Sequence, residues 1–295
     1  MMQALTGSIV ALVTPMHENG MVDFNALKKL VDWHIKEGTN GIVAVGTTGE
    51  SATLEIEEHL EVISSIVKYA DGRIPIIAGS GSNSTAQALK TTSESCKIGA
   101  DYSLLVTPYY NKPSQKGLIE HYLKIADSCD IKQILYNVPS RTACDLSPDT
   151  VKILSKHENI IGIKESVNSI ERINKLMDIS NENNDFLVFS GDDESFIDLL
   201  SLGGHGVISV AANVIPKGIS EICMFHKDNK DHAIKLNKKY KNLYELLFVE
   251  SNPIPVKWMM HKMGLIKNSI RLPLIELDKK YQENIISEML KLQLI

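Results

Sequence analysis

Lys164 is the residue whose type and position in this sequence best suit covalent chemistry. It lies near the end of the apolar run IIGIKES, and the period of two in a strand places it on one face with Ile160 and Gly162, where the glycine leaves room beside the lysine stem. In apolar surroundings the charged form of a lysine loses solvation, which frees the neutral amine to attack a carbonyl. The alternative is a strand-end lysine whose ammonium group extends into water.

The residues around Lys164 favour the first interpretation. Tyr136 precedes it by one strand–helix repeat, so both side chains can emerge at the ends of adjacent strands, where a phenol can donate and accept protons while an imine forms. Thr47 can hydrogen-bond that phenol, and the backbone N–H groups of Thr47 and Thr48 suit a carboxylate. Arg141 offers a bidentate fork for a second carboxylate. Together these residues predict an imine-forming aldol site.

Other kinds of site find less support in the sequence. Asp192 and Asp193 are adjacent carboxylates, which are commoner in turns than around a metal ion, and Glu50 is expected to cap a helix or pair locally. The nine histidines form no ligand-spaced cluster. GSGSN, from Gly79, lacks the third glycine of a dinucleotide motif. We therefore expect neither a metal nor a cofactor.

The candidate residues stand at the ends of short apolar runs that we expect to be strands. Eight such runs, nearly continuous in hydrophobicity and rich in β-branched residues, are typical of strands covered on both faces. They are SIVALVTP (8–15), GIVAVG (41–46), IPIIAGS (74–80), YSLLVTP (102–108), KQILYNVP (132–139), IIGIKES (160–166), FLVFSGD (186–192) and HGVISVA (205–211). Segments with helical period separate them, at 24–38, 57–70, 86–99, 117–129, 147–157 and 195–204.

Successive strand–helix units predict an α/β fold, a TIM (β/α)8 barrel, in which active sites lie at the carboxyl ends of the strands. We expect the catalytic barrel to occupy residues 1–224. Residues 225–295 form a C-terminal helical region that packs on the barrel or on a partner subunit. Within the tail of the chain, helices are predicted at 217–227, 232–249, 252–264 and 283–294.

The composition excludes several classes of protein. The net charge of -5 and the scattered lysines argue against a nucleic-acid partner. The amino terminus lacks the features of a signal peptide or membrane span, so we expect a cytoplasmic protein that does not bind membranes. The cysteines show no metal or redox spacing and are expected to be reduced; they are Cys96, Cys129, Cys144 and Cys223.

Five motifs, in this order and spacing, resemble those of the dihydrodipicolinate synthase family of class I aldolases: GTTGES, VTPYYNKPSQ, LYNVPSRT, GIKES and SGDD. The resemblance runs from about Phe24 to the stretch Asn252-Pro253-Ile254-Pro255, nearly the whole chain. It implies a TIM barrel with a C-terminal helical region that condenses pyruvate with L-aspartate 4-semialdehyde in lysine and diaminopimelate biosynthesis. It also implies a homotetramer built as a dimer of tight dimers.

The resemblance also implies roles for residues that match the family's motifs. Lys164 would form the pyruvate Schiff base, and Tyr136, Thr47 and Tyr110 would form a proton relay, with Tyr110 reaching in from a neighbouring subunit. The substrate-binding residues would be Thr48 for the pyruvate carboxylate, Arg141 for the aldehyde's carboxylate, Gly191 through its backbone and Ile208 in the pyruvate pocket.

Two alternatives stay open at this level. A sister aldolase, such as N-acetylneuraminate lyase or a 2-keto-3-deoxy sugar acid aldolase, would share the lysine and the tyrosine, whereas Arg141, the pair Thr47-Thr48 and Tyr110 favour a short aldehyde that carries a carboxylate. A non-catalytic binding protein on the same scaffold is the second alternative. The complete set of lysine, tyrosine and threonine argues against it.

The family's allosteric lysine site is matched only in part. Residues that match lysine-sensitive members are Ser51, Ala52, His59, Asn83 and Tyr109. Ile56, however, stands where those members have a histidine, and Gln87 stands where they have a glutamate that pairs with the ammonium group of lysine.

We therefore predict weak or absent inhibition by lysine. Loss of the charge-assisted contact at Gln87 costs about 1.5 to 3 kcal/mol, or roughly ten- to hundredfold in affinity. Steady-state rates measured against lysine concentration test this prediction, and inhibition in the range of lysine-sensitive members would contradict it.

Overall fold

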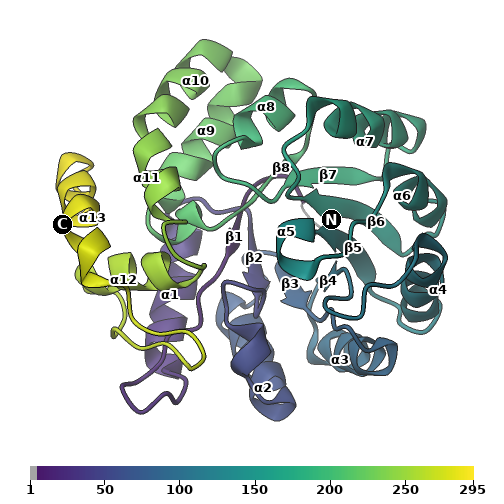
Figure 1. Cartoon of the computed structure of the whole chain (residues 1–295), viewed down its shortest axis with the longest axis horizontal. Coiled ribbons are helices and arrows are strands. Elements are labelled where there is room, and N and C mark those ends of the chain that lie inside the picture. The colour runs from purple at the N-terminus through teal and green to yellow at the C-terminus, as the bar shows by residue number, and fades with distance from the viewer. Residues whose placement is uncertain (1–4) are drawn as a thin grey trace.

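Eight parallel strands close into a barrel in the computed structural model, which describes residues 5–295 (Figure 1). The strands pair in chain order, and β8 pairs with β1 to close the ring. Their bounds are β1 Gly7–Ala11, β2 Gly41–Ala44, β3 Ile76–Gly79, β4 Tyr102–Val106, β5 Lys132–Asn137, β6 Ile160–Glu165, β7 Leu187–Ser190 and β8 Gly206–Ser209. The predicted TIM barrel is confirmed. Seven of the predicted segments contain one of these strands, and β1 begins one residue before the segment predicted at 8–15.

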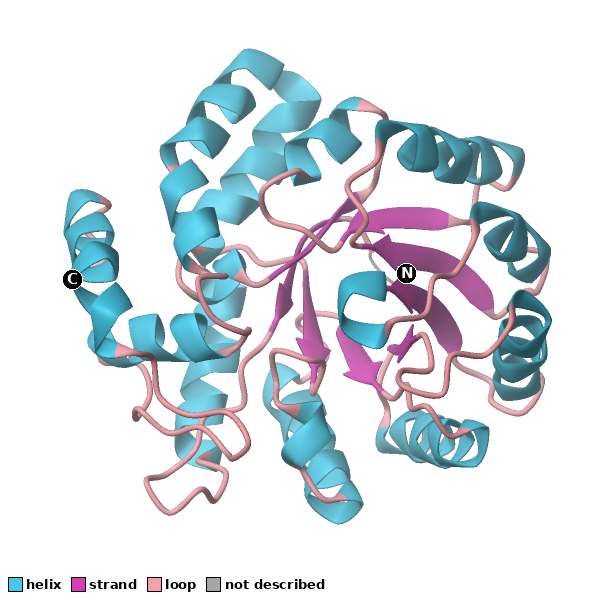
Figure 2. Cartoon of the chain, viewed as in Figure 1, coloured by secondary structure: helices cyan, strands magenta, loops and turns pink. Residues whose placement is uncertain are grey.

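Helices surround the barrel, and several begin where a serine accepts a hydrogen bond from the first turn, as Ser84, Ser114 and Ser147 do (Figure 2). The outer helices are α1 Phe24–Lys36, α2 Ile56–Ala70, α3 Thr85–Ile98, α4 Gln115–Ala126, α6 Pro148–Leu154, α7 Ile170–Glu182, α8 Phe196–Ser201 and α9 Pro216–Asp228. A short helix, α5 Pro139–Thr142, follows β5, and 3-10 turns lie at Ser51–Thr53 and Ala211–Asn213. The sequence analysis did not predict α5 and α7.

The C-terminal helices differ from the prediction at one point. They are α10 Lys230–Lys239, α11 Lys241–Leu246, α12 Ile254–Lys262 and α13 Lys279–Lys291. The single helix predicted at 232–249 is wrong, because the chain leaves helical geometry at Tyr240. The Tyr240 ring packs closely against Gly218 of α9, so tertiary packing overrides a continuous helical pattern here.

The strand side chains alternate between two environments, as the period of two requires. One set fills the barrel interior and includes Ile9, Val43, Ile77, Leu104, Ile134, Phe189 and Ile208. The other set packs beneath the outer helices and includes Val10, Ile42, Leu105, Leu135, Ile163 and Val188. Both sets are buried, which explains why the strands read as continuous apolar runs.

The strand β6 departs from simple alternation near its start. Its pairing with β5 shifts register there, because Ile160 and Gly162 face consecutive residues of β5. Ile160 consequently packs beneath the helices, whereas Ile161 packs against the interior cluster. The prediction that Ile160 shares a face with Lys164 is therefore wrong, because one extra residue in β6 inverts the alternation.

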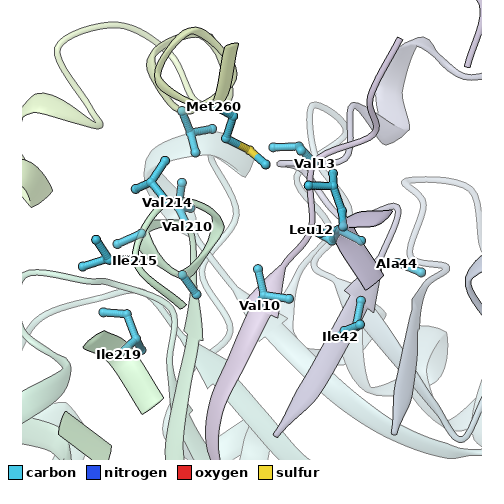
Figure 3. Packing of buried hydrophobic residues seen from close by; sticks show 14 of the residues in the cluster. Val10, Leu12, Val13, Ile42, Ala44, Val210, Val214, Ile215, Ile219 and Met260 are labelled. Atoms are coloured by element: carbon cyan, nitrogen blue, oxygen red, sulfur yellow. The ribbon is translucent and has the colours of Figure 1, made fainter. Parts of the chain in front are cut away.

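The C-terminal helices pack on the side of the barrel formed by β1, β2 and β8. Figure 3 shows Met260 of α12 above Val13 and Val214, and all three side chains belong to one buried cluster. The region is therefore attached to the barrel by a continuous apolar core. The predicted boundary between residues 224 and 225 falls within α9 and stays a prediction. Within residues 5–295, none of the helices has both the length and the apolar character needed to cross a membrane.

Two histidines lie buried in helices of the outer layer. His34 in α1 is fully buried beside the Thr39 hydroxyl, 3.1 Å from its Nδ1, and burial lowers its pKa to about 3. His121 in α4 lies 2.9 Å from the Thr85 hydroxyl, and burial lowers its pKa to about 4. Both rings therefore stay neutral in the folded protein at mildly acidic pH values where the same two histidines become protonated in the unfolded chain.

We predict that the free energy of unfolding falls as the pH drops from about 6.5 toward 4. The folded-state pKa of each histidine lies below its ordinary value, so protons bind preferentially to the unfolded state and the stability present above that ordinary value is lost on acidification. Near pH 5 each ring contributes about 2 kcal/mol of this loss. Urea unfolding of the wild type and His34→Leu at neutral and acidic pH measures it. An equal loss in both proteins would contradict the assignment to His34.

Candidate active site

A cavity of about 440 Å³ opens at the carboxyl ends of the barrel strands. Its lining includes Lys164, Tyr136, Thr47, Thr48 and Arg141. The five residues that suggested aldol chemistry are thus brought together from the ends of β2, β5 and β6, although they are spread over much of the sequence. This is the face on which barrel enzymes place their active sites.

Lys164 and Tyr136 form the centre of the cavity. They are direct partners in the pairing of β5 with β6, and the Lys164 Nζ lies 4.3 Å from the centre of the Tyr136 ring. Both residues are buried, at 6% and 7% exposure, so the amine meets the ring face largely shielded from bulk solvent. Lys164 therefore does not extend into solvent, and the amine and phenol are placed where they can exchange protons with one bound molecule.

The space beside the Lys164 stem is provided by a different glycine from the one expected. A Cβ added to Gly191 would lie 2.9 Å from the Lys164 Cε and would also collide with the Ser166 Oγ. A Cβ on Gly162 would instead meet the backbone of Leu187 in β7, 2.5 Å from its carbonyl oxygen. The expectation that Gly162 leaves room for the lysine is therefore wrong; Gly162 allows β7 to approach, and Gly191 makes room for the amine.

The turn that follows β2 is held by contacts from the C-terminal region and from the segment after β1. The Asn252 amide donates to the Thr48 hydroxyl over 2.9 Å, and the Thr14 hydroxyl donates to the Gly49 carbonyl over 2.7 Å. The Asn252 Oδ1 is buried without a hydrogen-bond partner among the described residues, and Asn252 is one of the residues that line the cavity. Asn252 was not predicted as a site residue. It lies in the stretch that resembles the family, but its residue type and spacing gave no sign of a role at the site.

Glu50 ends the same turn and forms a buried ion pair with Lys257 of α12. The ammonium group also donates to the Thr14 carbonyl, and the second carboxylate oxygen accepts from the Arg271 backbone N–H. Burial lowers the pKa of Lys257, and the Glu50 charge opposes that shift. The expectation that Glu50 caps or pairs locally is wrong, since its partner lies in the C-terminal region, where sequence proximity gives no signal.

Arg141 lies in α5 at the border between this cavity and a second one of about 400 Å³. The second cavity is lined by Ser51, Ala52, His59 and Tyr109 of the predicted lysine site, together with Ile56 and Gln87. Asn83 is not among its lining residues, but its amide donates to the Tyr109 carbonyl over 3.2 Å. The His59 Nε2 lies 2.8 Å from the Gly79 carbonyl, and burial lowers the pKa of this histidine.

Two predicted residues lie outside the first cavity in the single chain. Tyr110 is 89% exposed, has a φ of 75°, and does not line the cavity. Ile208 is fully buried in the barrel interior, and Val210, beyond it along the chain, is the residue that reaches the lining. Gly191 lines the cavity, and its backbone contact to a substrate stays a prediction.

The adjacent carboxylates Asp192 and Asp193 organise turns. Asp192 accepts from the backbone and hydroxyl of Ser195, and Asp193 accepts from the backbone N–H groups of Val210 and Ala211, each over 2.9 Å. Burial raises the pKa of Asp193. Among residues 5–295, no group of three or more His, Cys, Asp or Glu is placed to hold a metal ion.

Comparison with known sequences gives one consistent family. The sequence profile of the Dihydrodipicolinate synthetase family matches residues 4–292. A 4-hydroxy-tetrahydrodipicolinate synthase of Stutzerimonas stutzeri is 53% identical over 95% of each chain. The protein with the same name from Pseudomonas aeruginosa is 52% identical over the same shares.

Solved structures agree with the sequence comparison. The chloride-inhibited dihydrodipicolinate synthase of Acinetobacter baumannii, solved with pyruvate, is 50% identical and superposes with a TM-score of 0.96 over 99% of this chain and 100% of that chain. The dihydrodipicolinate synthase of Thermotoga maritima is 38% identical and has a TM-score of 0.97 over the same shares.

We predict that Gly191→Ala slows imine formation at Lys164 by about a hundredfold, because the new methyl group displaces the amine from its reactive position. The matched control is Gly117→Ala in α4, where the added Cβ would lie 3.3 Å from the Pro113 Cβ, a milder contact that is outside the cavity. Borohydride trapping of a 2-oxo acid, followed by mass spectrometry, measures the rate. Trapping by Gly191→Ala at the control's rate would show that Gly191 does not make room for the lysine.

Proposed function

The chain belongs to the dihydrodipicolinate synthetase family, and we propose that Lys164 is the Schiff-base residue with which it performs that family's reaction. The reaction condenses pyruvate with L-aspartate 4-semialdehyde to 4-hydroxy-tetrahydrodipicolinate, in lysine and diaminopimelate biosynthesis, and the chain is a lyase of class I aldolase type. The observation that carries the role of Lys164 is its buried amine, 4.3 Å from the Tyr136 ring centre at the cavity floor.

The proposed chemistry begins with attack of the neutral Lys164 amine on C2 of pyruvate. Tyr136 gives a proton to the departing oxygen, water leaves, and an imine remains. Loss of a proton from C3 gives an enamine, and this carbon bonds to the aldehyde carbon of the second substrate while the aldehyde oxygen gains a proton. The amino group of the second substrate then attacks C2, closes the ring and releases the Lys164 amine.

The two carboxylates of the substrates have separate partners in this proposal. The pyruvate carboxylate meets the backbone N–H groups of the Thr47 and Thr48 turn, whose residues line the same cavity as Lys164. Arg141, at the mouth, takes the carboxylate of the aldehyde in a bidentate pair. A guanidinium at the entrance favours an acidic aldehyde over an uncharged sugar aldehyde, which supports the synthase over a sister aldolase.

Tyr110 completes the proposed proton relay only if a second copy of the chain is present. Its side chain is 89% exposed on a loop at the cavity side, which suits a ring that enters a neighbouring subunit. A homotetramer of tight dimers and a cytoplasmic location stay predictions. Ile208 keeps its proposed role in the pyruvate pocket, although its side chain is buried in the barrel interior and Val210 is the nearby residue that lines the cavity.

We propose the second cavity as the site where lysine would act. Ile56 and Gln87 line it, so an ammonium group bound there would lack the glutamate partner of lysine-sensitive members. The charged residues that line this cavity are Arg141 and Glu50, and Glu50 is already paired with Lys257. The lining therefore offers no unpaired carboxylate to an ammonium group, which supports the prediction of weak inhibition.

Incubation with pyruvate and borohydride, followed by peptide mass mapping, tests the proposed function. We predict one adduct, confined to Lys164 and lost in Lys164→Ala, and consumption of L-aspartate 4-semialdehyde by the wild type. Lys152→Ala, which changes a surface lysine paired with Glu182, is the control and should behave as the wild type. An adduct without turnover of the semialdehyde would favour a sister aldolase, and no adduct would overturn the role of Lys164.

A further inference from the structure

The residues that follow Tyr136 and Lys164 in the chain belong to one buried network outside the barrel interior. Asn137 and Glu165 are paired across β5 and β6, immediately beyond the pair that forms the cavity floor. Successive strand residues point to opposite faces, so these two side chains lie behind the cavity. Asn137 is fully buried and Glu165 is 3% exposed.

Hydrogen bonds tie the two strand ends directly together. The Asn137 amide donates to both carboxylate oxygens of Glu165 over 3.1 Å and to Asp145 over 2.9 Å. The Arg172 Nε, from α7, donates to Glu165 over 2.7 Å, and its guanidinium also bonds Asp145 over 3.1 Å. We call Asn137, Asp145, Glu165 and Arg172 the strand-end network.

The strand-end network also closes the two loops that carry cavity residues. The Asn137 Oδ1 accepts from the backbone of Leu146 over 2.9 Å, and Arg172 donates to the carbonyl of the same residue, which closes the loop that contains Arg141. Glu165 accepts from the backbone N–H of Val167 over 2.8 Å, which closes the turn around Ser166. The amine, the phenol and the guanidinium of the cavity are thus positioned from behind by one set of contacts.

The charges of the network explain why its members depend on one another. Burial raises the pKa of the Glu165 carboxyl, and the Arg172 guanidinium and the surrounding donors oppose that shift. Removal of Arg172 would leave a buried carboxylate without its charge partner, and the strand ends would have to move to let water reach it. A change in this network is therefore transmitted to the adjacent Lys164 and Tyr136.

We propose that Asn137, Asp145, Glu165 and Arg172 are positioning residues that hold the Lys164 amine against Tyr136 and fix the loop of Arg141. None of them lines the cavity, so they act through the residues that do. The inference rests on the proposed Schiff-base function of Lys164. It assigns the placement of the Lys164 amine to residues that the substrate does not contact.

The first test compares imine formation in Arg172→Ala, Arg172→Lys and the wild type, at a temperature well below the unfolding midpoint of each. Arg172→Ala should trap pyruvate about tenfold or more slowly, and its KM for the semialdehyde should rise because the Arg141 loop is released. Arg172→Lys retains the charge and should recover part of the trapping rate. A network that only stabilises the fold would move neither the trapping rate nor this KM.

Asn159 provides a matched control at the opposite end of the same strand. It directly precedes β6, and its amide donates to the carbonyls of Ala126 and Cys129 over 3.2 and 3.5 Å. Asn159→Ala therefore removes partly buried hydrogen bonds near the same two strands without touching their carboxyl ends. Asn137→Ala should slow trapping, whereas Asn159→Ala should trap at the rate of the wild type.

The outcomes separate this inference from the proposed function. Normal trapping in the wild type with undiminished rates in Arg172→Ala and Asn137→Ala would overturn the inference alone, as would equal slowing in Asn137→Ala and Asn159→Ala. No adduct in the wild type would overturn the proposed function and the inference with it. If Arg172→Ala does not fold, the trapping rates of Glu165→Gln and Asn137→Ala provide the test in its place.

Discussion

The parallel pairing of β5 with β6 places Tyr136 directly opposite Lys164, and the remaining parts of the candidate site are arranged around that pair. The two side chains approach within 4.3 Å because the strands fix both backbones, and the closed barrel leaves neither strand an edge at which the register could slip. Alternation then sends the next residue of each strand, Asn137 and Glu165, to the other side. The same register therefore creates a reactive face inside the mouth and a polar, charge-paired face behind it.

The C-terminal region is part of the site's construction. Lys257 pairs with Glu50, and Asn252 bonds the Thr48 hydroxyl, so the turn after β2 is held by two contacts from distant segments. An uncompensated buried charge is costly, which makes the Glu50–Lys257 pair a demanding constraint on how α12 lies against the barrel. The continuous apolar core around Met260 holds α12 against the barrel in the position that this ion pair requires (Figure 3). Barrel and C-terminal helices consequently shape one cavity.

Much of the candidate site could be predicted from local sequence. Strand ends in a barrel converge by geometry, so a threonine pair, a tyrosine and a lysine that end the second, fifth and sixth apolar runs had to meet. The errors arose where a distant segment decides a local feature. The shift of register at Ile160 depends on β5, the break at Tyr240 depends on Gly218, and the room beside Lys164 comes from Gly191, directly after the next strand. No periodicity within a single segment carries that information.

The sequence by itself determined the barrel, the eight strands and the chemical types at the cavity, because hydrophobic period and turn residues are local properties of the chain. The family motifs added the expected roles. Only the tertiary structure decided how deeply Lys164 is buried, which glycine accommodates it, and that Glu50 is paired with a lysine far along the chain. It also decided that Asn137, Glu165 and Arg172 form one network. Burial and charge pairing depend on every segment that surrounds a group, so they exist only once the chain has closed around it.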